Sequence, residues 1–294
     1  MNAMEQMSTV GTLAPAILAH GLTKQYGANK AVDGVDLTLA PGTTLALIGH
    51  NGAGKTTLMK LILGLIRPSA GNLNVLGVEP GAAPLEHRRH IGFLPENVAF
   101  HDELTGTQTL NFYARLKGAS LSQCKTLLER VGLAFAAGRR VKTYSKGMRQ
   151  RLGLAQALLG EPRLMLLDEP TTGLDPASRV EFFRIMRELS DRGATVIISS
   201  HILTELEART DLVAIMNRSK LAAFGPLEAL RRQSYDDIAS TSPTTVTRDH
   251  TTFTRTATVT AVGSTSKRVA MSVSWTDQFG SHSPGVQLVT VIGQ

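Results

Sequence analysis

Cysteine, long apolar runs and acidic charge are all scarce in this sequence of 294 residues. The single cysteine, Cys124, excludes an internal disulfide framework and any zinc site built from several cysteines. No stretch approaches the roughly 18 uninterrupted apolar residues that a membrane-spanning helix needs. Residues 1–10 contain no Lys or Arg, unlike the start of a secretory signal. We therefore expect a cytoplasmic protein that does not itself cross a membrane.

The shortage of acidic residues leaves the chain basic. Lys and Arg number 31 against 24 Asp and Glu, so the net charge is +7. A basic surface favours an anionic neighbour, which is a nucleotide, a nucleic acid or the inner face of a membrane. The hydrophobic fraction of 42% is enough for a core and excludes disorder of the whole chain. Charge alone does not choose among the three neighbours.

The apolar segments predict an α/β protein with a doubly wound parallel sheet. Thr44–Ile48, Arg163–Leu167 and Thr195–Ser199 are continuous apolar or β-branched runs, and each precedes a polar loop and a helical pattern. Such runs are typical of buried parallel strands that carry functional groups at their C-terminal ends. From Ile17 to Ile48 short runs alternate with turns, which predicts an N-terminal antiparallel β subdomain. Helical periodicity between about 97 and 159 predicts a helical insertion.

The composition changes near residue 233. Residues 233–294 are rich in Ser and Thr, and 256–262 and 269–275 alternate as strands do. We therefore divide the chain into a nucleotide-binding domain, 1–232, and a tail, 233–294, of unknown role. The tail is a small β appendage, a disordered segment or a foreign sequence joined by a rearrangement.

A phosphate-binding loop is the strongest motif in the sequence. Gly49–Thr56 fits G-x-x-x-x-G-K-[ST], between an apolar strand and a predicted helix over Thr57–Ile66. In such a P-loop NTPase, glycines let backbone N–H groups and the helix dipole converge on phosphate oxygens. Lys55 would neutralise the charge of the β- and γ-phosphates, and the Thr56 hydroxyl would ligate Mg²⁺. The predicted ATP contacts here are Gly49, Asn51, Gly52, Ala53, Gly54, Lys55, Thr56 and Thr57.

Two adjacent carboxylates end the second apolar strand. Asp168 and Glu169 follow Leu164–Leu167 directly. Buried carboxylates are costly unless they bind a cation or exchange protons. We predict that Asp168 holds Mg²⁺ and that Glu169 is the general base for an attacking water. The alternative is an acidic pair that only stabilises a helix N-terminus.

With these motifs, Thr143–Arg151 and Leu166–Pro176 complete a pattern that resembles the ATP-binding subunits of ABC transporters. The resemblance covers about Ile17 to Leu230. It implies ATP hydrolysis with ATP and Mg²⁺ as cofactors, and it places Ser145 and Gly147 against the γ-phosphate of ATP held by the opposite subunit of a homodimer. Ser145 is also suited to cap a helix over 146–159.

Further residues match the family by position. The resemblance implies that Tyr26 stacks on adenine, although packing in the core is an equal alternative. It also implies that His201 contacts the γ-phosphate and positions the catalytic water. Asp175 lies in the loop that couples the two ATP sites. Glu96 stands where the family usually has glutamine, and we predict it as a further Mg²⁺ ligand.

The resemblance also implies partners. We expect a membrane-spanning permease subunit, a peripheral location on the inner face of the membrane, and no nucleic-acid partner. Within the family, His50, 93–100 and 144–148 are similar to the ATPase of the Nos transporter, which serves maturation of a copper enzyme, nitrous-oxide reductase. Other exporters share this signature. A basic cluster over 139–151 leaves a non-transport ATPase acting on nucleic acid as an alternative.

Overall fold

The computed structural model describes residues 14–201, 206, 209–227 and 229–230, and then 244–248, 251–261, 266–277 and 280–293. The chain divides into two compact units, residues 1–227 and 228–294. Every predicted site residue lies in the first unit. Within the described residues, no helix is both long and apolar enough to cross a membrane.

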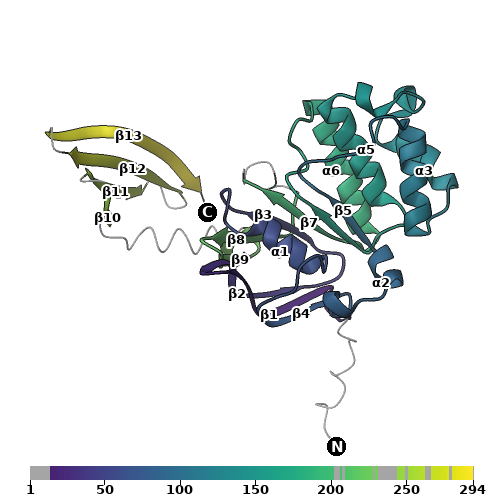
Figure 1. The fold of residues 1–294 in the computed structure, drawn as a ribbon. Coiled ribbons are helices and arrows are strands. Elements are labelled where there is room, and N and C mark those ends of the chain that lie inside the picture. Colours follow the sequence, from purple (N-terminus) through teal and green to yellow (C-terminus); the bar gives the residue numbers. More distant parts are fainter. Residues whose placement is uncertain are drawn as a thin grey trace, which may run out of the picture. The chain divides into compact units, whose positions relative to one another are not determined.

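A six-stranded sheet forms the centre of the first unit (Figure 1). Its first five strands are parallel, and the last pairs antiparallel with its neighbour. In spatial order the strands are β5 (Ile91–Leu94), β6 (Leu164–Leu167), β7 (Thr195–Ser200), β3 (Thr44–Ile48), β8 (Leu212–Asn217) and β9 (Lys220–Gly225). The doubly wound α/β class is therefore confirmed. The predicted strands β3, β6 and β7 are buried at every residue, because layers cover both faces of a parallel sheet.

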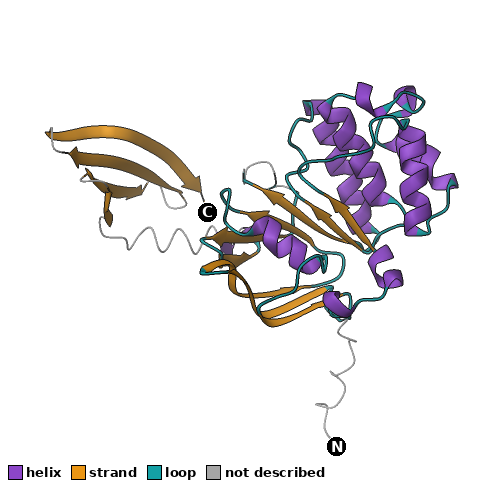
Figure 2. Ribbon diagram, viewed as in Figure 1, coloured by secondary structure: helices purple, strands orange, loops and turns teal. Residues whose placement is uncertain are grey.

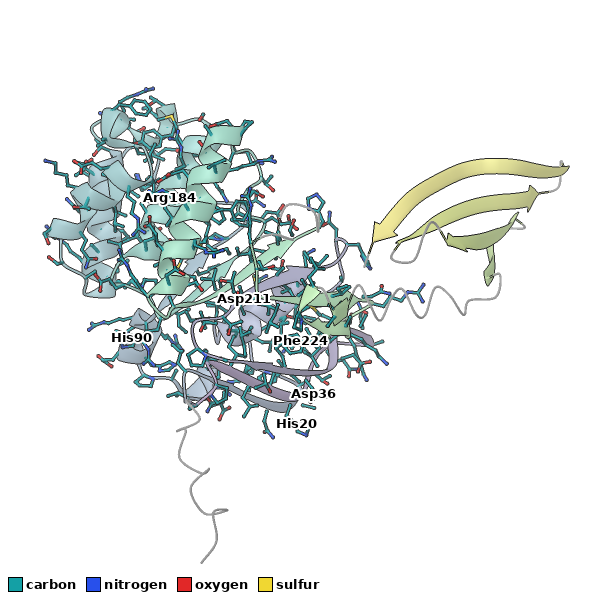
Figure 3. All side chains as sticks on the ribbon, turned by 180° about the vertical axis from the view of Figure 1, so that it is seen from behind. His20, Asp36, His90, Arg184, Asp211 and Phe224 are labelled. Atoms are coloured by element: carbon teal, nitrogen blue, oxygen red, sulfur yellow. The ribbon has the colours of Figure 1, made fainter. Side chains whose placement is uncertain are left out.

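A side chain anchors the start of β3. The Thr44 N–H donates to Asp211 Oδ2 at 2.7 Å, and the Asp211 N–H donates to Thr44 O at 2.9 Å. Figure 3 labels Asp211, just before β8. The phosphate loop leaves the other end of β3 and enters α1 (Lys55–Ile62). This helix begins two residues earlier than predicted. It also ends four residues earlier, because Gly64 has a left-handed φ of 66° that terminates the helix.

The antiparallel β subdomain has three strands, in the order β2-β1-β4. They are β1 (Ile17–Tyr26), β2 (Asn29–Leu39) and β4 (Ala70–Val75). Ile17 lies opposite both Leu39 and Val75, and all three side chains are fully buried. The predicted subdomain is confirmed with one correction. Thr44–Ile48 leaves it for the parallel sheet, and β4 supplies the third strand from beyond the phosphate loop.

Three helices fill the predicted insertion between β5 and β6. They are α3 (Gly106–Lys117), α4 (Ser122–Arg130) and α5 (Lys146–Leu158), and Figure 2 shows them grouped beyond the β5 edge of the sheet. Leu110, Cys124 and Leu128 pack inward, whereas Phe112 and Leu116 are more than half exposed. Later in the chain, α6 (Pro176–Asp191) connects β6 to β7. Two smaller helical segments, α2 (Leu85–Arg89) and η1 (Pro80–Ala82), precede β5.

The second unit contains a four-stranded antiparallel sheet in chain order. Its strands are β10 (Thr244–Arg248), β11 (Thr251–Ala261), β12 (Ser266–Asp277) and β13 (Gly280–Gly293). The segments predicted to alternate as strands fall in β11 and β12, except for residue 262, which lies outside the described residues.

Candidate functional site

The phosphate loop fits tightly between neighbouring backbones. A Cβ atom at Gly49 would lie 2.6 Å from Met216 O, and one at Gly54 would lie 2.3 Å from Ala31 O. Gly54 also has a φ of 105°, which favours glycine. Backbone contact with both sheets therefore requires glycine at these two positions. Gly52 takes a left-handed φ of 82°, and the buried Ala53 donates its N–H to His50 O at 3.1 Å.

Lys55 places a buried ammonium group beneath this loop. Its Nζ donates to Gly49 O at 2.6 Å and His50 O at 3.3 Å, and it lies 3.7 Å from Glu169 Oε1. Only 7% of the side chain is exposed. A buried cation with two neutral carbonyl partners and one carboxylate is well suited to an additional anion.

A second cluster joins the ends of three neighbouring elements. The Thr56 hydroxyl, on α1, donates to Asp168 Oδ2 at 2.8 Å, and the Ser199 hydroxyl, on β7, donates to Asp168 Oδ1 at 2.6 Å. The Ser199 hydroxyl in turn accepts the Glu169 N–H at 2.9 Å. Asp168 and Ser199 are both buried. Thr56 and Asp168, which are both predicted to hold Mg²⁺, are therefore in direct contact.

Glu169 has a strained backbone and one unsatisfied oxygen. Its φ is 47°, in the left-handed region that a residue with a side chain rarely adopts. Oε2 lies 2.9 Å from His201 Nδ1, whereas the buried Oε1 has no hydrogen-bond partner. This oxygen lies 3.7 Å from the Lys55 ammonium.

The oxygen donors of this cluster fit Mg²⁺. A threonine hydroxyl and an aspartate are hard ligands, and Mg²⁺ commonly takes its remaining ligands from phosphates and waters. Among the residues described, no group of three or more His, Cys, Asp or Glu is arranged to hold a metal without such help. Glu96 is exposed in the loop after β5 and makes no hydrogen bond or ion pair with Thr56 or Asp168 in the described part of the chain. The structure therefore leaves Glu96 outside the cluster.

Ser145 and Gly147 form a separate segment at the start of α5. Ser145 Oγ accepts the Met148 N–H at 3.2 Å, so the predicted helix cap is present. A Cβ atom at Gly147 would lie 3.0 Å from Gly173 O, which sets this segment beside the loop that follows Glu169. Neither residue hydrogen-bonds to the phosphate loop within the described residues. Gln150, which the sequence analysis did not identify, ties α5 to Pro170 O through its Nε2 at 3.3 Å.

Asp175 and Tyr26 lie in two other segments, at the start of α6 and at the end of β1. Asp175 caps α6 and accepts from the Ser178 hydroxyl at 2.6 Å and the Ser178 N–H at 2.9 Å. These hydrogen bonds hold the pKa of Asp175 below its usual value. Tyr26 is 52% exposed, and Lys24 Nζ lies 5.1 Å from its ring centre. This exposure excludes core packing for Tyr26, and the Lys24 ammonium lies over one face of its ring.

Three comparisons with known proteins all point to the same family. The sequence pattern of the family described as "ABC transporter" matches residues 32–172. The chain is 39% identical over 226 residues to the daunorubicin resistance ATP-binding protein DrrA3 of Streptomyces coeruleorubidus, covering 76% of this chain and 72% of the relative. It is 39% identical over 215 residues to the bacitracin transport ATP-binding protein BcrA of Bacillus licheniformis, covering 72% and 70%. A solved structure of an ATP-binding subunit of an ABC transporter aligns with a TM-score of 0.71 and 32% identity, over 75% of this chain and 93% of that one.

Proposed function

The chain belongs to the ATP-binding subunits of ABC transporters, and we propose that it powers export of a small molecule through a separate membrane-spanning permease subunit. As a member of this family it is an ATP-binding ATPase. The observation that carries the proposed chemistry is the free Glu169 Oε1 beside Lys55 Nζ, at 3.7 Å. A proton acceptor next to a phosphate-binding cation is suited to hydrolysis of a phosphoanhydride.

Each residue of the cluster has a separate role in this proposal. Lys55 neutralises the β- and γ-phosphates, and Glu169 accepts the proton of the attacking water. His201 holds the Glu169 carboxylate from the other oxygen and contacts the γ-phosphate. Thr56 and Asp168 hold Mg²⁺, which supplies positive charge on the phosphate oxygens when bound. The 2.9 Å contact of His201 with Glu169 and the 2.8 Å bond of Thr56 to Asp168 support these assignments.

The other predicted ATP contacts require a second copy of the chain. The first turn of α5 contains no acidic residue and begins with Lys146, so its N-terminus favours an anion. Because Ser145 and Gly147 make no hydrogen bond to the phosphate loop within the described part of their own chain, we propose that they bind ATP held by the other subunit of a homodimer. Asp175 would couple the two sites, and Tyr26 would stack on adenine.

The named relatives support a drug-type cargo. The two described above are named for daunorubicin resistance and bacitracin transport. We therefore favour an amphiphilic small molecule over a copper-related cargo. The Nos-type alternative depends on His50 and on 93–100 and 144–148, and neither of those relatives carries that name. With a permease as partner, the chain would be peripheral on the cytoplasmic face of the membrane.

The basic cluster gives little support to a nucleic-acid partner. Arg140 and Lys142 both pair with Glu103, and Arg149 pairs with Asp102. Three of the six cations over 139–151 are therefore paired with carboxylates of the same chain. Phosphate contacts to a nucleic acid need cations that are free to replace counterions.

Reconstitution with the permease tests the proposed function. The chain and its permease would be placed together in lipid vesicles, and ATP hydrolysis and daunorubicin uptake into inside-out vesicles would be measured. We expect uptake that requires ATP and is lost with Lys55→Ala. The proposal is wrong if the permease leaves ATP hydrolysis unchanged and neither daunorubicin nor bacitracin moves. Transport of copper ions in the same vesicles would favour the Nos-type alternative.

A further inference from the structure

A cavity of about 320 Å³ lies behind the segments that carry the predicted ATP contacts. It is lined by α5, α6, the end of α4 and the loop after Glu169. Its apolar wall consists of Leu94, Leu154, Leu174, Phe182 and Ile185, all of them buried. This size and lining are suited to a small organic molecule with an apolar body.

Arg151 lines this cavity and carries one unsatisfied polar atom. Arg151 Nη1 donates to Gly132 O at 2.9 Å, but its buried Nε has no hydrogen-bond partner. A buried N–H without an acceptor is costly, and a ligand oxygen would satisfy it. Because Arg151 is a cation whose hydrogen-bond partners are neutral carbonyls, a carboxylate is the acceptor that it would bind most strongly.

Among the charged groups around the cavity, Arg151 is the cation that makes no ion pair within the described residues, although its charge helps to lower the pKa of the exposed Asp175. Arg130 pairs with Glu188 at 2.5 Å, and Glu181 pairs with Arg184, which lies on α6 and is labelled in Figure 3. Glu129 is exposed at the rim, where water screens its charge. The charge distribution therefore favours a single negative group at Arg151.

We propose that this cavity is a regulatory site for a small carboxylic acid with an apolar body, bound through its carboxylate to Arg151. Its walls belong to the two segments that the proposed ATP site needs in fixed positions. Arg151 follows Ser145 on α5, and Ser178 lines the cavity while hydrogen-bonding to Asp175. A molecule between α5 and α6 ties these segments together and changes ATP turnover. The regulatory role rests on the proposed ATPase function, whereas binding does not.

Binding is tested with 4-phenylbutyrate and its neutral analogue 4-phenylbutanol, titrated into the full chain and followed by ligand-observed NMR. We expect 4-phenylbutyrate to bind with a dissociation constant on the order of 1 mM or better. The alcohol should bind at least tenfold more weakly. Arg151→Lys keeps the positive charge but removes the Nε donor, and it should weaken 4-phenylbutyrate binding by a similar factor.

A matched pair of variants on α6 separates occupancy of the cavity from general effects. Ala177 lines the cavity and is exposed, so Ala177→Phe blocks it without disturbing the core. Val180 is 64% exposed on the same helix and is not part of the lining, so Val180→Phe is the control. Only Ala177→Phe should abolish binding. Equal binding by the two variants, or no binding by the unmodified chain, would overturn the site.

ATP turnover gives the test of regulation. Saturating 4-phenylbutyrate should change turnover at least twofold in the unmodified chain and in Val180→Phe, but not in Ala177→Phe. If 4-phenylbutyrate binds but turnover does not differ between these variants, the regulatory role is wrong, although the binding site itself stands. A chain without any ATPase activity would instead contradict the proposed function, and the binding titration would still decide whether the site exists.

Discussion

His201 Nδ1 lies 2.9 Å from Glu169 Oε2, and this contact joins the C-terminal ends of the adjacent strands β6 and β7. It leaves the second oxygen of Glu169 without a hydrogen-bond partner and 3.7 Å from Lys55 Nζ. The left-handed backbone of Glu169 stores strain in the same position. The protein's own contacts therefore orient the carboxylate, which supports the proposed role of Glu169 as a proton acceptor.

Replacing Glu169 with glutamine should separate ATP binding from hydrolysis. The amide keeps the shape of the side chain but accepts no proton, so turnover should fall by about 10²-fold or more. ATP affinity should stay within about threefold, because Lys55 and the loop backbone are unchanged. Turnover would be measured with purified chain and permease, and ATP binding by equilibrium titration. Hydrolysis close to that of the unmodified chain would contradict the general-base role.

Mixed dimers should reveal whether Ser145 acts on the ATP of the other subunit. Subunits with Ser145→Arg and subunits with Lys55→Ala are each expected to form inactive homodimers. A mixed dimer contains one composite site with neither change, so mixing should restore measurable hydrolysis. The comparison is the activity of each parent alone at the same total concentration. Full activity of the Ser145→Arg homodimer would exclude a role in trans.

Much of the site was predictable because each motif is a short, continuous segment that directly follows an apolar strand. The apolar runs of β3 and β6 precede the phosphate loop and the Asp168 and Glu169 pair directly, so parallel pairing brings them to one edge. Because both segments begin at that edge of the sheet, Thr56 and Asp168 come into contact. Ser199 and Gln150 were missed because their roles depend on register and packing across distant segments.

The elements that the sequence did not reveal are short or polar. β5 has four residues and β4 reads Ala-Gly-Asn-Leu-Asn-Val, so neither contains a long apolar run. Each becomes a strand because a neighbouring strand supplies its hydrogen bonds. Within α3, Leu110 is buried, whereas the equally apolar Phe112 and Leu116 are exposed. Periodicity identifies a helix, but only tertiary packing decides which face is covered.

Loss of the Ser199 hydroxyl should weaken both the fold and the proposed Mg²⁺ site. In Ser199→Ala the buried Asp168 Oδ1 and the Glu169 N–H lose their shared partner, which costs about 1–3 kcal/mol of unfolding free energy. The Mg²⁺ concentration for half-maximal hydrolysis should rise about tenfold. Ser190→Ala is the control, because Ser190 Oγ donates to Gly42 O away from the site. An equal Mg²⁺ requirement in both variants would exclude the role of Ser199.

Lys117 should make stability depend on pH above neutrality. Burial lowers the pKa of Lys117 from 10.5 to about 8. Below pH 8 the buried ammonium is charged in the folded chain, and it therefore lowers the free energy of unfolding by its full amount. Between pH 8 and 10.5 the unfolded chain binds more protons, and stability from this group rises with pH. Lys117→Met should therefore stabilise the protein by about 1–3 kcal/mol at pH 7, and this gain should shrink by pH 10. Urea unfolding at both pH values measures it, with exposed Lys125→Met as the control. A gain that is independent of pH would contradict the assignment.

Removal of residues 233–294 should leave nucleotide binding and hydrolysis intact. Every predicted contact with ATP or Mg²⁺ lies in the unit formed by residues 1–227, and this unit contains both the phosphate loop and the Asp168 cluster. A chain that ends at Arg232 is therefore expected to keep its ATP affinity within tenfold, or about 1.4 kcal/mol. Affinity would be titrated beside the full chain, and circular dichroism would show that the shortened chain is folded. A larger loss of affinity in a folded chain would mean that the tail contributes to the site and that the domain boundary at 232 is wrong.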